Sequence, residues 1–189
     1  MKKNTLRNHL LLLRKNIPYD TRIALTTSAN TNLIEFIQTK IDDNSLKNIA
    51  LFHSFRDEID TSLTINYLLE KEITVCLPII HPINHTHLLF QSFDKTTEMV
   101  KNKFGILEPK LNVNQIIIKE SIDLIILPLT GYDEMGNRLG MGGGFYDRTF
   151  EHYPFKERLI GFAFSIQKVG SIPAEPWDLK IARIISDEP

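Results

Sequence analysis

The hydrophobic positions of the chain form short continuous runs separated by stretches in which polar and apolar residues mix. The runs are rich in isoleucine, leucine and valine, which is typical of strands buried on both faces of a sheet. They predict strands at the following positions: 48–54 (NIALFHS), 73–79 (ITVCLPI), 122–128 (IDLIILP), 158–165 (RLIGFAFS) and 180–185 (KIARII).

The stretches between these runs have helical periodicity. Apolar residues three and four positions apart predict helices over 4–15, about 20–40 and about 61–71, and a short helix beginning near Gly144. The segment 82–112 is more irregular, with HLLFQSF as an additional strand. Because strands alternate with helices, we expect one α/β domain over residues 1–189. The fold class is a three-layer fold with a mainly parallel open sheet flanked by helices.

Composition and charge narrow the class of protein. The 189 residues are 42% hydrophobic and 24% charged, as in ordinary globular chains. A formal net charge of -1 argues against nucleic acid as an obligate partner. No apolar run approaches the ~20 residues of a membrane span, and the run at 10–13 is too short for an export signal. The lone Cys76 allows no intramolecular disulfide, favours the cytoplasm and is expected in the core.

Glycine is concentrated in one segment, LPLTGYDEMGNRLGMGGGFYDR at 127–148, which holds six of the nine glycines. It follows the carboxyl end of a predicted strand, where open α/β sheets bind ligands. It completes neither the P-loop nor the dinucleotide pattern, yet successive glycine N–H groups can converge on an anion. Arg138 could bind phosphate, and Asp147 is an oxygen ligand suited to Mg²⁺. The alternative is a mobile surface loop in which Asp147 and Arg148 flank a helix start.

The first predicted helix has a basic face. At 100° per residue, Lys3, Arg7 and Arg14 fall together on the helical wheel. The adjoining apolar stripe consists of Leu6, Leu10, Leu13 and Ile17. A bound polyanion would relieve the repulsion between these like charges. On the sequence alone, a solvated basic face is the favoured interpretation.

Two further clusters contain chemically active side chains. In FHSFRDEIDT, at 52–61, Glu58 could accept hydrogen bonds from ligand N–H groups, or it could simply favour a helix start. In HPINHTH, the spacing of His81, His85 and His87 fits no zinc pattern and favours a solvated loop. No serine, cysteine or threonine lies in a nucleophile elbow, so covalent acyl chemistry lacks support.

Taken together, these segments resemble the 5-formyltetrahydrofolate cyclo-ligase family over essentially the whole chain. The most specific element is RLGMGGGFYDR, which follows PLTGYD. Supporting elements are KNTLR at 3–7, DEI at 57–59, FGILEP at 104–109 and PWDLK at 176–180. Met141, Phe145 and Ala182 stand where other residues are more usual in the family.

The resemblance implies an ATP- and Mg²⁺-dependent conversion of 5-formyltetrahydrofolate to 5,10-methenyltetrahydrofolate, by phosphorylation of the formyl group and attack by the substrate N10. The implied catalytic residues are Arg138, Tyr146 and Glu58. The implied ATP contacts are Lys3, Asn4, Thr5, Leu6, Arg7, Arg138, Leu139, Gly140, Met141, Gly142, Gly143, Gly144, Phe145 and Tyr146. The implied folate contacts are His53, Glu58, Met141, Gly142, Gly143, Gly144 and Phe145, and the implied metal ligands are Asp147 and Asp178. We expect a cytoplasmic monomer with no nucleic-acid or membrane partner.

Two other functions fit the sequence. The glycine-rich loop could hold the phosphate of a sugar phosphate or of coenzyme A in a related α/β enzyme that hydrolyses no ATP. The chain could also be a folate- or nucleotide-binding module without turnover. The presence of Arg138, Asp147 and Glu58 together argues against the second alternative.

Overall fold

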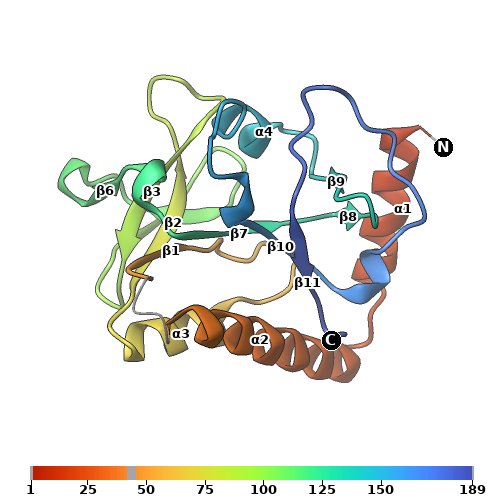
Figure 1. Ribbon diagram of the computed structural model, residues 1–189, viewed down its shortest axis with the longest axis horizontal. Coiled ribbons are helices and arrows are strands. Elements are labelled where there is room, and N and C mark those ends of the chain that lie inside the picture. The colour runs from red at the N-terminus through yellow and green to blue at the C-terminus, as the bar shows by residue number, and fades with distance from the viewer. Residues whose placement is uncertain (1, 42–45, 189) are drawn as a thin grey trace.

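A seven-stranded sheet forms the centre of the molecule in the computed structural model, which describes residues 2–41 and 46–188 (Figure 1). The strand order is β11-β10-β7-β1-β2-β3-β6. The strands from β11 to β2 pair in parallel, whereas β3 and β6 are antiparallel to their neighbours. The bounds are β1 Asn48–Ala50, β2 Thr74–Ile80, β3 Leu88–Phe93, β6 Ile116–Ile117, β7 Leu124–Pro128, β10 Leu159–Phe162 and β11 Arg183–Ile185.

Helices and two small hairpins complete the fold. The α-helices are α1 Lys3–Lys15, α2 Tyr19–Ile41, α3 Ser62–Glu70 and α4 Phe145–Thr149. One hairpin pairs β4 (Met99–Lys101) with β5 (Leu107–Pro109), and the other pairs β8 (Gly131–Tyr132) with β9 (Arg138–Leu139). Single 3₁₀ turns lie at Val113–Gln115, Lys119–Ser121, Lys156–Arg158 and Ser165–Gln167.

The predicted elements are present, with differences at their ends. The strand predicted at 48–54 ends at Ala50, although the N–H of Leu51 still donates to the carbonyl of Cys76. The chain then leaves the sheet and forms a turn. The strand predicted at 158–165 ends at Phe162, because a 3₁₀ turn begins at Ser165. The irregular segment 82–112 contains β3, as expected, and also the β4–β5 hairpin, which the sequence analysis missed.

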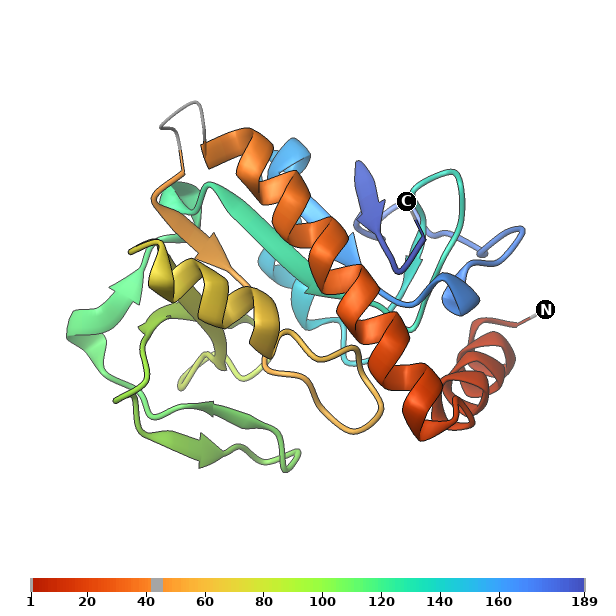
Figure 2. The ribbon, with the colours of Figure 1, turned by 90° about the horizontal axis from the view of Figure 1, so that it is seen from below.

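Alternate residues of the central strands enter two cores on opposite faces of the sheet, because side chains alternate along a strand. Ile49 packs with the core beneath α2 and α3, and its neighbour Ala50 packs with the other. Figure 2 shows α2 and α3 lying across the first face. The second face is covered by the region around α4, including the fully buried Phe150. The expected α/β class is therefore confirmed.

Cys76 belongs to this second core, as predicted, and is fully buried. Burial raises the pKa of its thiol to about 12, and the nearby Asp123 carboxylate adds to this effect. Because the thiolate is the reactive form, Cys76 is a packing residue and not a nucleophile.

The strand order reverses direction between β1 and β7. From β1 the chain continues through β2 and β3 toward one edge, then returns to β7 on the other side of β1 and continues to β10 and β11. Ligands of open α/β sheets bind beyond the carboxyl ends of the strands at such a switch point. The segments that follow β1 and β7 are the polar cluster at 52–61 and the glycine-rich loop.

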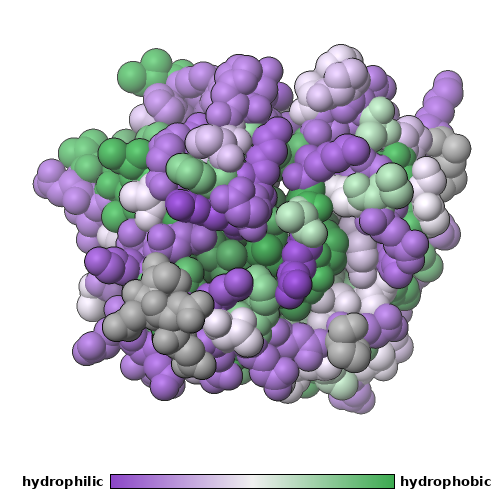
Figure 3. Space-filling view, in the orientation of Figure 1, coloured by the Kyte–Doolittle hydropathy of each residue, from purple (hydrophilic) through white to green (hydrophobic). Residues whose placement is uncertain are grey.

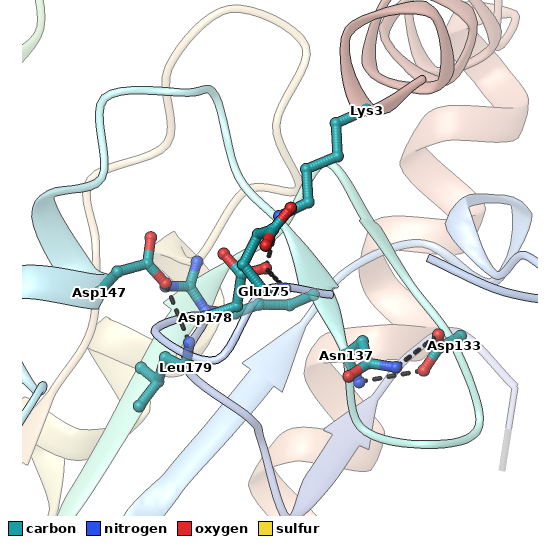
Figure 4. A network of polar contacts seen from close by, with 8 residues as sticks. Lys3, Asp133, Asn137, Asp147, Glu175, Asp178 and Leu179 are labelled. Atoms are coloured by element: carbon teal, nitrogen blue, oxygen red, sulfur yellow. Dashed lines mark hydrogen bonds and ion pairs between the residues drawn. The ribbon is translucent and has the colours of Figure 1, made fainter. Parts of the chain in front are cut away.

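Asp133 fastens the glycine-rich loop to the rest of the fold. Its Oδ1 accepts the backbone N–H groups of Met135 and Asn137, both at 3.0 Å. Its Oδ2 accepts from the Asn137 side chain at 2.9 Å (Figure 4). The same oxygen accepts the N–H of Ile172 at 2.9 Å. Burial alone would raise the pKa of this carboxyl, but the hydrogen bonds together lower it. Asp133 therefore holds the β8–β9 turn closed.

We expect Asp133→Asn to lower the free energy of unfolding by about 2–4 kcal/mol at pH 7, because an amide nitrogen would face two N–H donors. For a chain of this size, that corresponds to a fall in Tm of roughly 4–16 °C. The folded-state pKa is depressed, so the stabilisation is complete above the unfolded value of about 3.9 and is lost as the pH falls through the folded value. Thermal melts of both proteins should therefore converge on acidification. A gap in Tm that widens toward low pH would contradict this assignment.

The surface is mostly polar. Figure 3 shows apolar side chains at the sheet edge near β6, where Val113 and Ile118 are exposed. Within residues 2–41 and 46–188, no helix is both long and apolar enough to cross a membrane.

Candidate functional site

A cavity of about 720 Å³ lies beyond the carboxyl ends of β1, β2 and β7. Its walls come from α1, the segment after β1, the tip of the β4–β5 hairpin, the glycine-rich loop and the segment around Trp177. This volume is in the range that holds a cofactor or a small-molecule substrate. The cavity occupies the switch point at which the sheet topology predicts a ligand.

The structure brings most of the predicted site residues into this one cavity. The lining includes Lys3, Arg7, His53, Glu58, Arg138, Leu139, Gly140, Met141, Gly142, Gly143, Gly144, Phe145, Tyr146, Asp147 and Asp178. Three predicted ATP contacts do not line it. Asn4 accepts a hydrogen bond from Arg7, Thr5 is exposed, and Leu6 packs in a small core with Leu10 and Leu139. Leu6 faces that core because it belongs to the apolar stripe of α1.

The glycines of the loop leave room for two arginines. Gly142 has a φ of 95°, and a Cβ placed there would lie 3.4 Å from the guanidinium carbon of Arg7. Gly144 has a φ of 64°, and a Cβ there would lie 2.6 Å from an Arg148 nitrogen. The Nε of Arg7 donates to the Gly140 carbonyl at 2.8 Å, and Arg148 donates to the Gly143 carbonyl. Two guanidinium groups therefore flank a bare backbone, which is a suitable arrangement for a phosphate.

Arg138 projects from β9 beside this loop. Its side chain is 3% exposed, and its Nη2 donates to Asp147 Oδ1 at 2.6 Å. Burial lowers the pKa of Arg138, and the neighbouring Asp147, Tyr146 and Asp178 oppose that shift. Its buried Nε has no hydrogen-bond partner in the described part of the chain. Arg138 is therefore a fixed, desolvated positive charge at the cavity wall.

The start of the chain meets a segment near its end at the same wall. The Nζ of Lys3 lies 2.5 Å from Asp178 Oδ2, which also accepts the N–H of Glu175 at 2.7 Å (Figure 4). Asp147 accepts the N–H of Leu179 at 3.2 Å. These contacts place two carboxylates close to Arg138.

The donor set fits a magnesium ion that shares its ligands with a phosphate. Across residues 2–41 and 46–188, no three His, Cys, Asp or Glu side chains form a group able to hold a metal alone. Mg²⁺ usually binds through one or two carboxylates together with substrate phosphates and water. Asp147 and Asp178 can supply the carboxylates. Their assignment as metal ligands stays a prediction.

The basic face of α1 divides into two parts. Lys3 and Arg7 line the cavity, whereas Arg14 is buried, with 3% of its surface exposed. The favoured interpretation from sequence, a solvated basic face, is therefore wrong for Arg14. Burial against the segment after β7 explains the difference, because Arg14 Nη1 donates to the Leu129 carbonyl at 3.3 Å.

Glu58 lines the cavity from the turn after β1. Its Oε2 accepts the N–H of Phe55 at 3.0 Å, and Arg56 within this turn has a φ of 55°. Burial raises the pKa of the Glu58 carboxyl above its usual value, and the lowering effects of the Arg14 charge and the Phe55 hydrogen bond offset only part of this rise. Burial likewise raises the pKa of Tyr146, and the Glu58 charge adds to that shift. Glu58 is thus a hydrogen-bond acceptor with a fixed orientation in a poorly solvated part of the cavity wall.

Sequence reasoning missed two aromatic residues of the cavity. Phe104, at the tip of the β4–β5 hairpin, packs edge to face on Phe145 with ring centroids 5.7 Å apart. Trp177 lines the cavity and is 65% exposed. The segments FGILEP and PWDLK were recognised as motifs, which was the available signal, but the only site role drawn from them was that of Asp178 as a metal ligand.

The histidine-rich segment HPINHTH lies outside this cavity. His81 Nδ1 accepts the N–H groups of Ile83 and Asn84, and His85 is exposed. These contacts make His81 part of a turn, in agreement with the predicted loop.

The fold and the cavity define an α/β enzyme with its site at the switch point of a parallel sheet. A family model described as the 5-formyltetrahydrofolate cyclo-ligase family matches residues 1–187. The chain belongs to the 5-formyltetrahydrofolate cyclo-ligase family and is a ligase.

Curated relatives and solved structures agree with this family. The chain is 42% identical to 5-formyltetrahydrofolate cyclo-ligase of Haemophilus influenzae over 77% of its length and 78% of the relative. It is 39% identical to the Escherichia coli K12 protein of the same name over 73% and 76%. The 5,10-methenyltetrahydrofolate synthetase of Mycoplasma pneumoniae superposes with a TM-score of 0.79 at 27% identity, over the whole of both chains. That of Aquifex aeolicus gives 0.83 at 25% identity, over 100% of this chain and 91% of the other.

Proposed function

We propose that this enzyme closes the ring of 5-formyltetrahydrofolate to give 5,10-methenyltetrahydrofolate, with ATP as co-substrate and Mg²⁺ as cofactor, and releases ADP and phosphate. One observation supports this proposal most directly: two features line the same cavity. The first is the glycine loop flanked by Arg7 and Arg148, and the second is Glu58. A phosphate site and an acceptor for ligand N–H groups therefore share the same space.

The chemistry requires no protein nucleophile. The formyl oxygen is a poor leaving group, so it first takes the γ-phosphoryl group of ATP and ADP is released. The substrate N10 then attacks the activated formyl carbon and loses its proton to solvent, the C–O bond breaks, and phosphate leaves as the ring closes. Such a reaction is accelerated mainly by positioning and by charge stabilisation.

Charges on the nucleotide side are well placed for this reaction. Lys3, Arg7 and Arg138 stabilise negative charge on the phosphates, and the N–H groups of the glycine loop orient them. Asp147 and Asp178 hold Mg²⁺ directly or through water, and the ion neutralises phosphate charge. Tyr146 keeps its phenol protonated, because burial raises its pKa, and so remains a hydrogen-bond donor.

The folate side is formed by the turn after β1. Glu58 accepts hydrogen bonds from N–H groups of the folate, with His53 beside it. Residues 141–145 lie near the formyl group, so the same loop contacts both substrates. We further propose that the chain acts as a single-domain cytoplasmic monomer without nucleic-acid or membrane partners.

Ultraviolet absorbance tests the proposal. Protein, 5-formyltetrahydrofolate, ATP and Mg²⁺ should give an increase in the near-ultraviolet band of methenyltetrahydrofolate. Omission of ATP, or chelation of the metal by EDTA, should abolish the increase, and added Mg²⁺ should restore it after chelation. A flat trace from folded protein that still binds ATP would favour a sugar-phosphate or coenzyme A enzyme, or a binding module.

A further inference from the structure

Arg14 is a buried charge that the proposed chemistry does not use. Its side chain comes from the last turn of α1 and is covered by the segment after β7. Its Nε is buried and has no hydrogen-bond partner among residues 2–41 and 46–188. A buried guanidinium with an unpaired nitrogen lowers the stability of the fold. If packing were its only role, a leucine or methionine at this position would give a more stable protein.

The charges around Arg14 belong to the turn that carries Glu58. Glu58 and Asp57 both raise the pKa of Arg14, against the lowering effect of burial. In the described part of the chain no ion pair joins Arg14 directly to Glu58, so the two charges interact through space. Such an interaction is strong where water is scarce, as at this wall.

A second arginine links the backbones that carry Arg14 and Glu58. Arg22 of α2 donates through Nη1 to the Asp57 carbonyl at 2.9 Å and through Nη2 to the Arg14 carbonyl at 2.5 Å. One side chain therefore ties the end of α1 to the turn beside Glu58. This turn is otherwise closed by the Phe55–Glu58 contacts.

We propose that Arg14 is a positioning residue that keeps Glu58 ionised at the cavity wall, so that Glu58 accepts hydrogen bonds from the substrate. The role of Glu58 toward the substrate rests on the proposed function, whereas the effect of Arg14 on the charge of Glu58 is independent of it.

Several ionisable groups lie around Glu58. They are Arg14 of α1, Arg22 of α2, whose Nη1 donates to the Asp57 carbonyl, Tyr146 of α4, and His53, Arg56 and Asp57 of the segment after β1. Among these groups, Arg14 is the cation whose charge lowers the pKa of Glu58.

Two substitutions separate the charge of Arg14 from its packing. Arg14→Gln keeps a donor for the Leu129 carbonyl and loses the charge, whereas Arg14→Lys keeps the charge. The Glu58 carboxyl carbon is followed by ¹³C NMR as a function of pH, and its signal is assigned by its loss in Glu58→Gln. In the wild type it should be ionised at the assay pH. Arg14→Gln should move the titration of Glu58 to higher pH. Arg14→Lys should bring it most of the way back to the wild-type value.

Kinetics test the consequence for the substrate. For Arg14→Gln, the KM for 5-formyltetrahydrofolate should rise about tenfold at pH 7 for each unit by which the Glu58 titration moves above that pH, and it should recover at higher pH. The KM for ATP should stay within about twofold. A merely structural role would change both KM values and would not recover with pH.

The outcomes separate the two proposals. An unchanged Glu58 titration in folded Arg14→Gln would overturn the inference whatever the activity, as would a wild-type Glu58 that is protonated at the assay pH. A shifted titration with an unchanged KM for folate would support the electrostatic part and remove Glu58 from the folate site. If the wild type shows no ligase activity, the NMR titration still decides the inference.

Discussion

Replacement of Arg138 by alanine is expected to lower kcat/KM for ATP by about a thousandfold, which is the scale of a lost charge contact in phosphoryl transfer. Arg138 is buried, and its contact with Asp147 fixes the orientation of its guanidinium group. Its charge acts in a desolvated wall, where it is worth more than in water. Steady-state kinetics with varied ATP, together with a thermal melt, measure the effect.

The matched control is Arg183→Ala, which removes an exposed arginine on β11 that packs over the Phe36 ring and is not among the residues that line the cavity. It should leave kcat/KM unchanged. Arg138→Lys keeps the charge but loses the planar guanidinium group that can make two parallel hydrogen bonds. Its kcat/KM for ATP should therefore lie between those of Arg138→Ala and wild type. Turnover of ATP within threefold of wild type by folded Arg138→Ala would remove Arg138 from the proposed nucleotide site.

Glu58→Gln is expected to raise the KM for 5-formyltetrahydrofolate by about 10- to 100-fold, the usual value of a hydrogen bond to a charged group. The amide keeps an acceptor for the Phe55 N–H but has lost the negative charge. The KM for ATP should hardly change, because Glu58 lies in the turn after β1 and not in the glycine loop. Glu70→Gln, an exposed residue at the end of α3, is the control. Equal effects on both substrates would indicate a disturbed cavity and contradict a folate contact.

The fold was largely predictable because its central strands are continuous apolar runs. The run at 122–128 has no strongly polar residue after Asp123, which predicts a strand that is buried on both faces of the sheet. The β8–β9 hairpin was not predictable, since strands of two residues have no periodicity. It is held by Asp133, and the contact of Asp133 with Ile172 depends on a segment distant in sequence.

The position of the candidate site was predictable where its residues form one local motif, as in the glycine loop, which lines the cavity. Leu6 shows the opposite case. The periodicity of α1 assigned it to the apolar stripe, whereas the family resemblance assigned the whole of 3–7 to ATP, and the structure agrees with the periodicity. Arg14 was not predictable, because its burial depends on Leu129 and on the turn at Glu58, which reach α1 only after the chain has folded.

The contact of Lys3 with Asp178 also has a consequence for synthesis of the protein. These two residues are 175 positions apart in the chain, and both line the same cavity. On the ribosome, a growing chain that already contains Lys3 therefore lacks the rest of this wall until Asp178 has emerged. Ligands of this cavity can contribute their full binding free energy only after Asp178 has emerged, so the sheet and helices that form earlier must be stable without them.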